Sequence, residues 1–328
     1  MSTQRRYIQA GCLYEICFRA KEGLPLPPKQ VINLLITSAI ARAQRDHKVH
    51  LCHYLWMSNH PHLYLIARDA DQCKNFYGEV QKKLTESIKR LLGESQMNIW
   101  EGTANVAHIG DLDEAVREIA YAFANPATAN LVDTIEDYPG LNTFALTNND
   151  ELTFQHKQKA CWVRDRTVKP LQGPCLSERQ DMLLTKQLKE ANKKRPHELV
   201  LEPNLWMQCF GITSNEDIRK VNQRIHRQLW QLEEKARELR LLEGKSIVGR
   251  SKLLSEPIMK PHTPKKKERK VFVLCSVKEL RISLIQQYKE FCAICRERYS
   301  EWKQSNFDNP WPPGAFRPPL PVQANAWG

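Results

Sequence analysis

The stretch of residues 52–66 restricts the possible folds of this chain more than any other. Residues 52–57 and 60–66 are two runs of strand-forming side chains, and the polar pair Ser58-Asn59 separates them. A two-residue polar connection between such runs is typical of a tight turn. The sequence therefore predicts an antiparallel β-hairpin here.

The second run of the hairpin carries two histidines on one side. Side chains alternate between the faces of a strand, so His60, His62 and Tyr64 share one face, whereas Leu63 and Leu65 point to the other. Two imidazoles at this spacing converge on one point, as a divalent-metal site requires. Ordinary polar strand residues are the alternative interpretation of the same spacing.

The segments around the hairpin predict an α+β domain. Strands are expected over residues 7–20 and 97–109, and helices over 28–44, 71–92 and 111–124. The order strand–helix–strand–strand–helix–strand is typical of a ferredoxin-like antiparallel sheet, here followed by one more helix. We expect the helices to cover one sheet face, through the leucines of the hairpin, and the histidine face to stay open for metal and DNA.

The third expected helix ends in a second group of polar residues. Tyr121 and Asn125 are four residues apart, so they emerge on the same helix face near its C-terminal end. Pro126 is expected to mark the helix boundary. Glu118 precedes Tyr121 by three residues and is an alternative oxygen ligand for a metal. Tyr121 could also be an ordinary core aromatic residue.

Two sequence blocks resemble one known family. The first block reads Met57-Ser-Asn-His-Pro-His-Leu-Tyr-Leu65 and is similar to the Met-Pro-Asn-His-x-His-Leu-Leu-Leu signature of the REP-associated tyrosine transposases. The second reads Tyr121-Ala-Phe-Ala-Asn-Pro-Ala-Thr-Ala-Asn-Leu-Val132 and resembles that family's Tyr-Ile-x-x-Asn-Pro-Val-x-Ala-Gly-Leu-Val. Both blocks occur in the family's order and separation, and the resemblance covers roughly residues 5–145. These transposases belong to the single-tyrosine HUH group.

The resemblance implies a site and a reaction. His60, His62 and Asn125 would bind a divalent metal, and Tyr121 would attack single-stranded DNA to form a 5′-phosphotyrosine and free a 3′-hydroxyl. The family's substrates are folded single-stranded hairpins, so hairpin DNA is the expected partner. Because related transposases can share active sites across a dimer, a homodimer is possible.

The proposed nucleophile needs help from a charged group. The hydroxyl pKa of tyrosine is near ~10, so attack on a phosphodiester requires that the phosphate be polarised and the leaving oxygen stabilised. A divalent metal acts in this way as a Lewis acid. Mg²⁺ prefers oxygen ligands and a histidine pair also admits Mn²⁺, so the sequence leaves both ions open.

Two other functions remain open at the level of the sequence. One is a domesticated protein that binds hairpin DNA or RNA without cutting it. The neighbourhoods of Trp100 and Tyr138 depart from the family pattern, which leaves room for this alternative. The other is a metal hydrolase, which the sequence favours least because it contains no further carboxylate or histidine cluster at useful spacing.

Composition sets the class of partner and the compartment. The chain has 328 residues and a formal net charge of +12, which favours a polyanionic partner such as nucleic acid. No apolar run approaches the ~18–20 residues of a membrane span, and the first residues contain no signal peptide. The ten cysteines form no disulfide-like framework. We therefore expect a cytoplasmic protein with reduced thiols and no contact with a membrane.

The remainder of the chain differs in character from the first part. The expected organisation is a catalytic domain over residues 1–145, an irregular linker over 146–176, a mainly α-helical accessory region over 177–308 and a proline-rich tail over 309–328. Within the accessory region, amphipathic helices are expected over 177–192, 215–242 and 277–302. Residues 260–270 form a basic loop that could contact a DNA backbone or remain a solvated linker.

Overall fold

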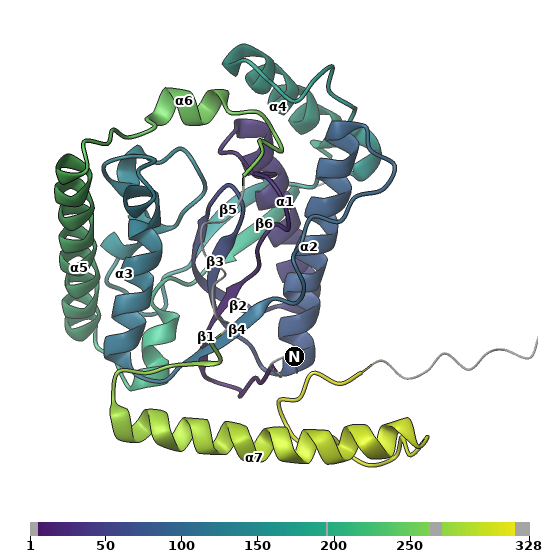
Figure 1. Cartoon of the computed structure of the whole chain (residues 1–328), viewed down its shortest axis with the longest axis vertical. Coiled ribbons are helices and arrows are strands. Elements are labelled where there is room, and N and C mark those ends of the chain that lie inside the picture. Colours follow the sequence, from purple (N-terminus) through teal and green to yellow (C-terminus); the bar gives the residue numbers. More distant parts are fainter. Residues whose placement is uncertain (1–5, 195, 263–270, 319–328) are drawn as a thin grey trace, which may run out of the picture.

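A computed structural model describes residues 6–194, 196–262 and 271–318 of the chain. Its centre is a mixed five-stranded sheet with the strand order β2-β3-β1-β4-β7 (Figure 1). The strands of this sheet are β1 (Leu13–Cys17), β2 (His50–Trp56), β3 (Pro61–Ile66), β4 (Asn105–Ile109) and β7 (Val273–Leu274). The first four strands pair antiparallel, and the short β7 is parallel to β4.

The predicted hairpin is confirmed as β2 and β3. The two strands pair antiparallel from His50 opposite Ile66 to Trp56 opposite Pro61. The N–H of Met57 donates to the carbonyl of His60 over 2.9 Å and closes the turn. β1 lies between β3 and β4, so the strand that follows the N-terminus occupies the middle of the antiparallel part of the sheet.

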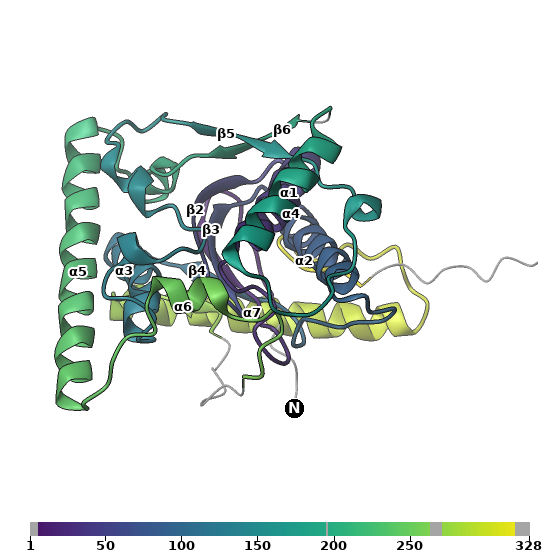
Figure 2. The same ribbon diagram turned by 90° about the horizontal axis from the view of Figure 1, so that it is seen from above.

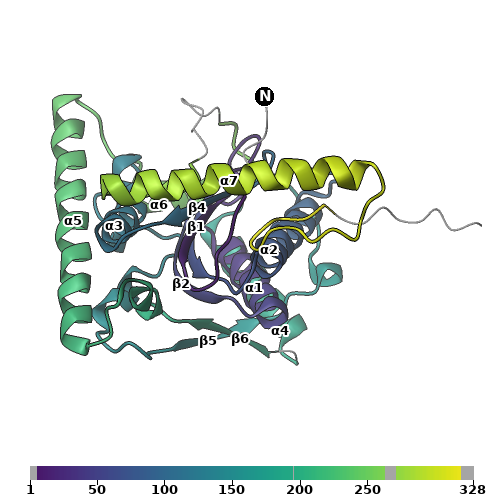
Figure 3. The same cartoon turned by 90° about the horizontal axis from the view of Figure 1, so that it is seen from below.

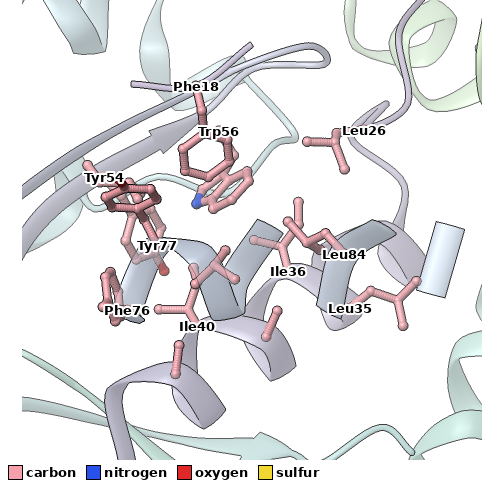
Figure 4. Packing of buried hydrophobic residues seen from close by; sticks show 14 of the residues in the cluster. Phe18, Leu26, Leu35, Ile36, Ile40, Tyr54, Trp56, Phe76, Tyr77 and Leu84 are labelled. Atoms are coloured by element: carbon pink, nitrogen blue, oxygen red, sulfur yellow. The ribbon is translucent and has the colours of Figure 1, made fainter. Parts of the chain in front are cut away.

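Two helices cover the leucine face of the sheet. These are α1 (Gln30–His47) and α2 (Ala70–Leu92), which contact each other and enclose a large apolar core. Figure 4 shows this core, where Phe18, just after β1, and Trp56 of β2 meet the aliphatic side chains of α1 and α2. The ring centroids of Phe18 and Trp56 are 6.0 Å apart in an edge-on arrangement. Leu63 and Leu65 belong to the same core, as expected.

The expectation that helices cover only one sheet face is wrong. The helix α3 (Leu112–Thr128) covers the opposite face, and α5 (Asn215–Leu242) packs along α3 (Figure 1). The reason is that this second face is largely apolar as well. Leu55 and Tyr64 point to it and pack with Phe123 of α3 in a second core. When a helix covers an apolar sheet face and removes it from water, the free energy of the folded state falls.

Several element boundaries differ from those that the sequence predicted. The first strand covers only Leu13–Cys17 of the expected residues 7–20, and β4 covers only Asn105–Ile109 of the expected 97–109. Pro126 does not mark the end of α3 but lies inside it.

The second half of the chain contains both the predicted helices and strands that were not predicted. The helices over 177–192, 215–242 and 277–302 are confirmed as α4 (Glu178–Asn192), α5 and α7 (Lys278–Lys303). The range 146–176, expected to be irregular, contains β5 (His156–Cys161), which pairs with β6 (Pro196–Leu201). Figure 2 shows this two-stranded ribbon beside α1 and α4. The short helix α6 (Arg250–Ser255) follows α5.

The C-terminal helix lies across the lower end of the molecule. Figure 3 shows that α7 passes close to β1 and β4. The ring of Phe291 in α7 lies beside that of Tyr7, with centroids 4.4 Å apart and the ring planes tilted by 37°. Most of the expected basic loop, residues 263–270, and the last part of the expected tail, residues 319–328, lie outside the described residues. In the described part of the chain, no helix combines the length and apolar character that a membrane crossing requires. All ten cysteines are free thiols.

Candidate functional site

The two predicted metal-binding histidines lie together at the start of β3. His62 belongs to the strand and has 9% of its surface exposed, whereas His60 precedes the strand and is half-buried. Their ring centroids are 5.1 Å apart and the ring planes are nearly perpendicular, at 71°. The spacing predicted from the sequence therefore brings the imidazoles to one place. They do not lie on an open face, because α3 covers it.

A hydrogen bond fixes the orientation of each imidazole ring. His62 Nδ1 lies 2.5 Å from a carboxylate oxygen of the buried Glu15, and His60 Nδ1 lies 2.7 Å from the side-chain oxygen of Asn59. Both partners are acceptors, so each Nδ1 carries the proton and donates it. In a ring whose Nδ1 is the only protonated nitrogen, the lone pair is on Nε2. Histidine ligands of metals are commonly held by a carboxylate or another acceptor in this way.

Burial and neighbouring charges set the charge state of the groups around the histidines. Burial lowers the pKa of His60 well below its ordinary value, and the nearby His62 and Arg19 lower it further, so the ring is neutral at pH 7. Burial also raises the pKa of Glu118 to about 7, helped by the carboxylates of Glu15 and Glu114. At neutral pH the Glu118 carboxyl is therefore partly protonated, which reduces the negative charge close to His62.

The C-terminal part of α3 brings the second predicted group to the histidines. The amide nitrogen of Asn125 lies 3.4 Å from Nε2 of His62. Tyr121, one helical turn earlier, has 47% of its surface exposed, so its side chain is accessible from solution. The tyrosine hydroxyl of Tyr64 donates to the backbone carbonyl of Glu118 over 2.8 Å and fastens this part of α3 to β3.

Pro126 explains the orientation of the Asn125 side chain. A proline has no N–H, so the carbonyl of Ala122 lacks the helical hydrogen bond that residue 126 would normally donate. The amide nitrogen of Asn125 lies 3.3 Å from that carbonyl and 3.2 Å from the carbonyl of Tyr121. The proline inside the helix thereby frees one acceptor, the carbonyl of Ala122, which helps to hold the Asn125 amide close to His62.

The histidines fit a divalent metal, and Asn125 fits after one rotation. Both imidazoles have Nε2 available, whereas Asn125 directs its nitrogen rather than its oxygen to His62. A half-turn of the Asn125 amide would place its oxygen near His62 and break the contacts of its nitrogen with the carbonyls of Tyr121 and Ala122. Across residues 6–194, 196–262 and 271–318, no cluster of three or more His, Cys, Asp or Glu side chains could hold a metal ion. The site thus depends on the two imidazoles and on an amide.

The sequence interpretation missed Glu15 and Asn59. Glu15 lies in a central strand whose other side chains are mostly apolar and buried, and it pairs across the strands with Tyr64. A buried carboxylate is costly unless it is hydrogen-bonded, so a single Glu in such a strand indicates a hydrogen-bonding partner nearby. Asn59 had been interpreted only as a turn residue. His53, on the neighbouring strand, is fully buried, and its ring centroid lies 5.7 Å from that of Phe123. It therefore packs in the core between β2 and α3.

The chain has little similarity to known proteins. No protein-family model matches the sequence, and no curated protein matches it. Among solved structures, the chain is similar to a REP-associated tyrosine transposase bound to a REP hairpin, with 19% sequence identity and a TM-score of 0.38. The similarity covers 45% of this chain and 86% of that one. A likeness of this degree does not define the function of the chain.

Proposed function

We propose that this protein is a metal-dependent transposase of the tyrosine HUH type, which cuts and rejoins single-stranded hairpin DNA. In this proposal residues 1–145 form a ferredoxin-like catalytic domain, His60, His62 and Asn125 hold Mg²⁺ or Mn²⁺, and Tyr121 is the nucleophile. The antiparallel strand order β2-β3-β1-β4, with α1 and α2 as connections, supports the ferredoxin-like part.

One contact carries the proposal. The two sequence blocks that resemble the transposase family are far apart in the chain, yet the Asn125 amide of the second lies 3.4 Å from His62 of the first. The same helix presents Tyr121 to solvent one turn away. A helix that served only to cover the sheet would not need a polar residue against the histidine or an exposed tyrosine beside it.

The chemistry follows from these side chains. The Tyr121 hydroxyl oxygen would attack the phosphorus of a DNA phosphodiester, the bond to the 3′-oxygen would break, and a 5′-phosphotyrosine and a 3′-hydroxyl would result. Attack by a 3′-hydroxyl of another strand would then release the tyrosine and restore a phosphodiester. A bound divalent ion would supply Lewis-acid polarisation of the phosphate. Arg19, whose charge acts on His60, would add positive charge for the phosphate.

Denaturing-gel cleavage of single-stranded hairpin oligonucleotides tests the proposal. The substrates come from the sequence that flanks the gene, and the reactions contain Mn²⁺ or Mg²⁺. We expect a metal-dependent cut that leaves protein on the 5′ end of the product. Tyr121→Phe should abolish it, because the ring keeps its size and only the nucleophilic oxygen is lost. Tyr299→Phe, at an exposed tyrosine of α7, is the matched control and should cut normally.

The outcomes separate the two candidate functions. Cleavage that persists in Tyr121→Phe would contradict the assignment of the nucleophile. Saturable hairpin binding without cleavage, across several hairpins and with both metals, would favour the alternative of a domesticated binder of DNA or RNA. A homodimer that shares the site between two copies stays a prediction.

A further inference from the structure

A pocket separate from the histidine site lies between α1, β5 and α4. Its volume is about 540 Å³, and its walls include Thr37 of α1, Lys159 of β5 and Lys189 of α4. α1 covers the leucine face of the sheet, so this pocket and His62 lie on opposite sides of the sheet. β5 and α4 lie beyond residues 1–145, in the part of the chain that the proposed function leaves without a role.

The pocket is positively charged. Three of its lining residues are lysines and none is acidic. Lys193 forms an ion pair with Glu190, but Lys159 and Lys189 have no ion pair with any residue that the structure describes. Two ammonium groups without an ion pair, on two elements that line one pocket, attract an anion, and a phosphate can accept hydrogen bonds from both.

A buried hydroxyl group in the pocket has no hydrogen-bond partner. Thr185 has only 6% of its surface exposed, and its Oγ1 finds no donor or acceptor among the described residues. A buried polar atom without a partner costs free energy, so such an atom in the wall of a pocket indicates a site where a ligand provides the missing bond. The hydroxyl can donate to a phosphate or accept from a ligand amine.

We propose that this pocket binds a nucleotide unit, with its phosphate between Lys159 and Lys189. The volume lies in the range of small-molecule sites and exceeds what a phosphate alone would fill. Leu34 and Leu141 provide an apolar wall for a planar base. The side-chain oxygen of Asn33 provides a hydrogen-bond acceptor, while its amide nitrogen donates to the carbonyl of Pro139 over 3.1 Å. The unit could belong to a free nucleotide or to the end of a nucleic-acid strand. The proposal uses none of the residues assigned to the proposed function, so either can fail alone.

Fluorescence titration with the nucleotide analogue mant-AMP tests the pocket in the full-length protein. We expect saturable binding to the wild type, and a Kd about tenfold higher in the double variant Lys159→Gln/Lys189→Gln, because the phosphate loses both ammonium partners. The matched control is Lys157→Gln/Lys186→Gln, which removes the same charge from β5 and α4 outside the pocket and should leave the Kd unchanged. Equal affinity in the two double variants, or no saturable binding, would overturn the proposal.

Competition identifies the source of the nucleotide unit. Displacement of mant-AMP by AMP but not by a 5′-phosphorylated oligothymidine would assign the pocket to free nucleotides. Displacement by the oligonucleotide at lower concentration than AMP would assign it to strand ends. Displacement by adenosine as effective as that by AMP would overturn the role of the lysines.

Thr185 and Cys161 provide readouts that do not depend on charge. Thr185→Val replaces the unpartnered hydroxyl with a methyl group, so we expect weaker mant-AMP binding at a melting temperature equal to or above that of the wild type. Cys161 lines the pocket, whereas Cys175 is exposed elsewhere. Bound AMP should slow maleimide labelling of Cys161 and leave that of Cys175 unaffected. Unchanged binding in Thr185→Val together with unprotected Cys161 would place the nucleotide outside this pocket.

Discussion

Neighbouring residues decide which nitrogen of each of the two histidines can bind a metal. The Glu15 carboxylate and the Asn59 side-chain oxygen each accept a hydrogen bond from an Nδ1 atom, and this leaves both Nε2 atoms as acceptors or ligands. A negatively charged acceptor also makes the ring more basic and therefore a stronger metal ligand. The effect of Glu15 on the site can be measured separately from that of the histidines.

Replacement of Glu15 by Gln is expected to weaken metal binding about tenfold, because the hydrogen bond to His62 survives but the negative charge is lost. Isothermal titration of the purified protein with Mn²⁺ measures this. Glu22→Gln, at an exposed position outside the site, is the control. Equal Mn²⁺ affinity in the wild type and Glu15→Gln would mean that Glu15 serves only the packing of β1.

At the scale of elements, α3 is held between the sheet and α5. The side chain of Glu233, on α5, accepts a hydrogen bond over 2.8 Å from the N–H of Ile135, which begins the short 3₁₀ turn after α3 (Ile135–Asp137). Glu233 is buried, with 6% of its surface exposed, and burial raises its pKa to about 7. The position of α3, and with it the placement of Tyr121 and Asn125, thus depends on a carboxyl group that titrates near neutral pH.

Glu233→Gln is expected to stabilise the protein at high pH. In the folded protein Glu233 keeps its proton up to about pH 7, whereas in the unfolded chain it loses it near its ordinary pKa of 4.5. The folded state binds more protons in this window, so the free energy of unfolding falls as pH rises through it. The variant avoids this loss and should be more stable by on the order of 1–2 kcal/mol at pH 8.

Urea denaturation of Glu233→Gln and the wild type at pH 8 and pH 4.5 measures the effect. The stability advantage of the variant should nearly disappear at the lower pH, where the wild-type carboxyl is protonated in the folded state and about half protonated in the unfolded chain. Glu238→Gln, at an exposed position on the same helix, controls for the change of charge. An advantage that is independent of pH would show that Glu233 is not the titrating group.

At the scale of the whole molecule, the two halves of the chain are joined through the start of α1. Lys29 precedes α1 and provides no side-chain cap, and the carboxylate of Asp181, on α4, accepts hydrogen bonds from the N–H groups of Gln30 and Val31 at 2.7 and 2.8 Å. Lys29 is fully buried and donates to the carbonyls of Leu176 and Leu254. The second half of the chain therefore completes a helix of the first.

Asp181→Ala is expected to lower the free energy of unfolding by about 2 kcal/mol, because two N–H groups at the positive end of α1 lose a charged acceptor. Chemical denaturation at pH 7 measures the loss. Glu190→Ala, at an exposed position on the same helix, should change stability by less than about 0.5 kcal/mol. A similar small effect in Asp181→Ala would indicate that solvent replaces the cap and that the two halves are more independent.

Local sequence patterns were sufficient for the hairpin and for the long helices. The hairpin of residues 52–66 and the helix of residues 215–242 follow from alternation and from apolar periodicity, which are properties of neighbouring residues. The same alternation placed His60 and His62 side by side. Pro126 was misjudged because a proline favours a helix boundary locally, whereas α3 continues through it and the Asn125 side chain takes up the freed carbonyl.

By itself, the sequence determined the two histidines, the tyrosine and the asparagine as candidates, because their spacing is written in short segments. Only the tertiary structure decided which groups surround them. Glu15 reaches His62 because β1 pairs with β3, and α3 closes the histidine face because that face is itself apolar. These contacts join residues far apart in the chain, and they form only when burial of apolar surface brings the elements together. No local pattern encodes such contacts.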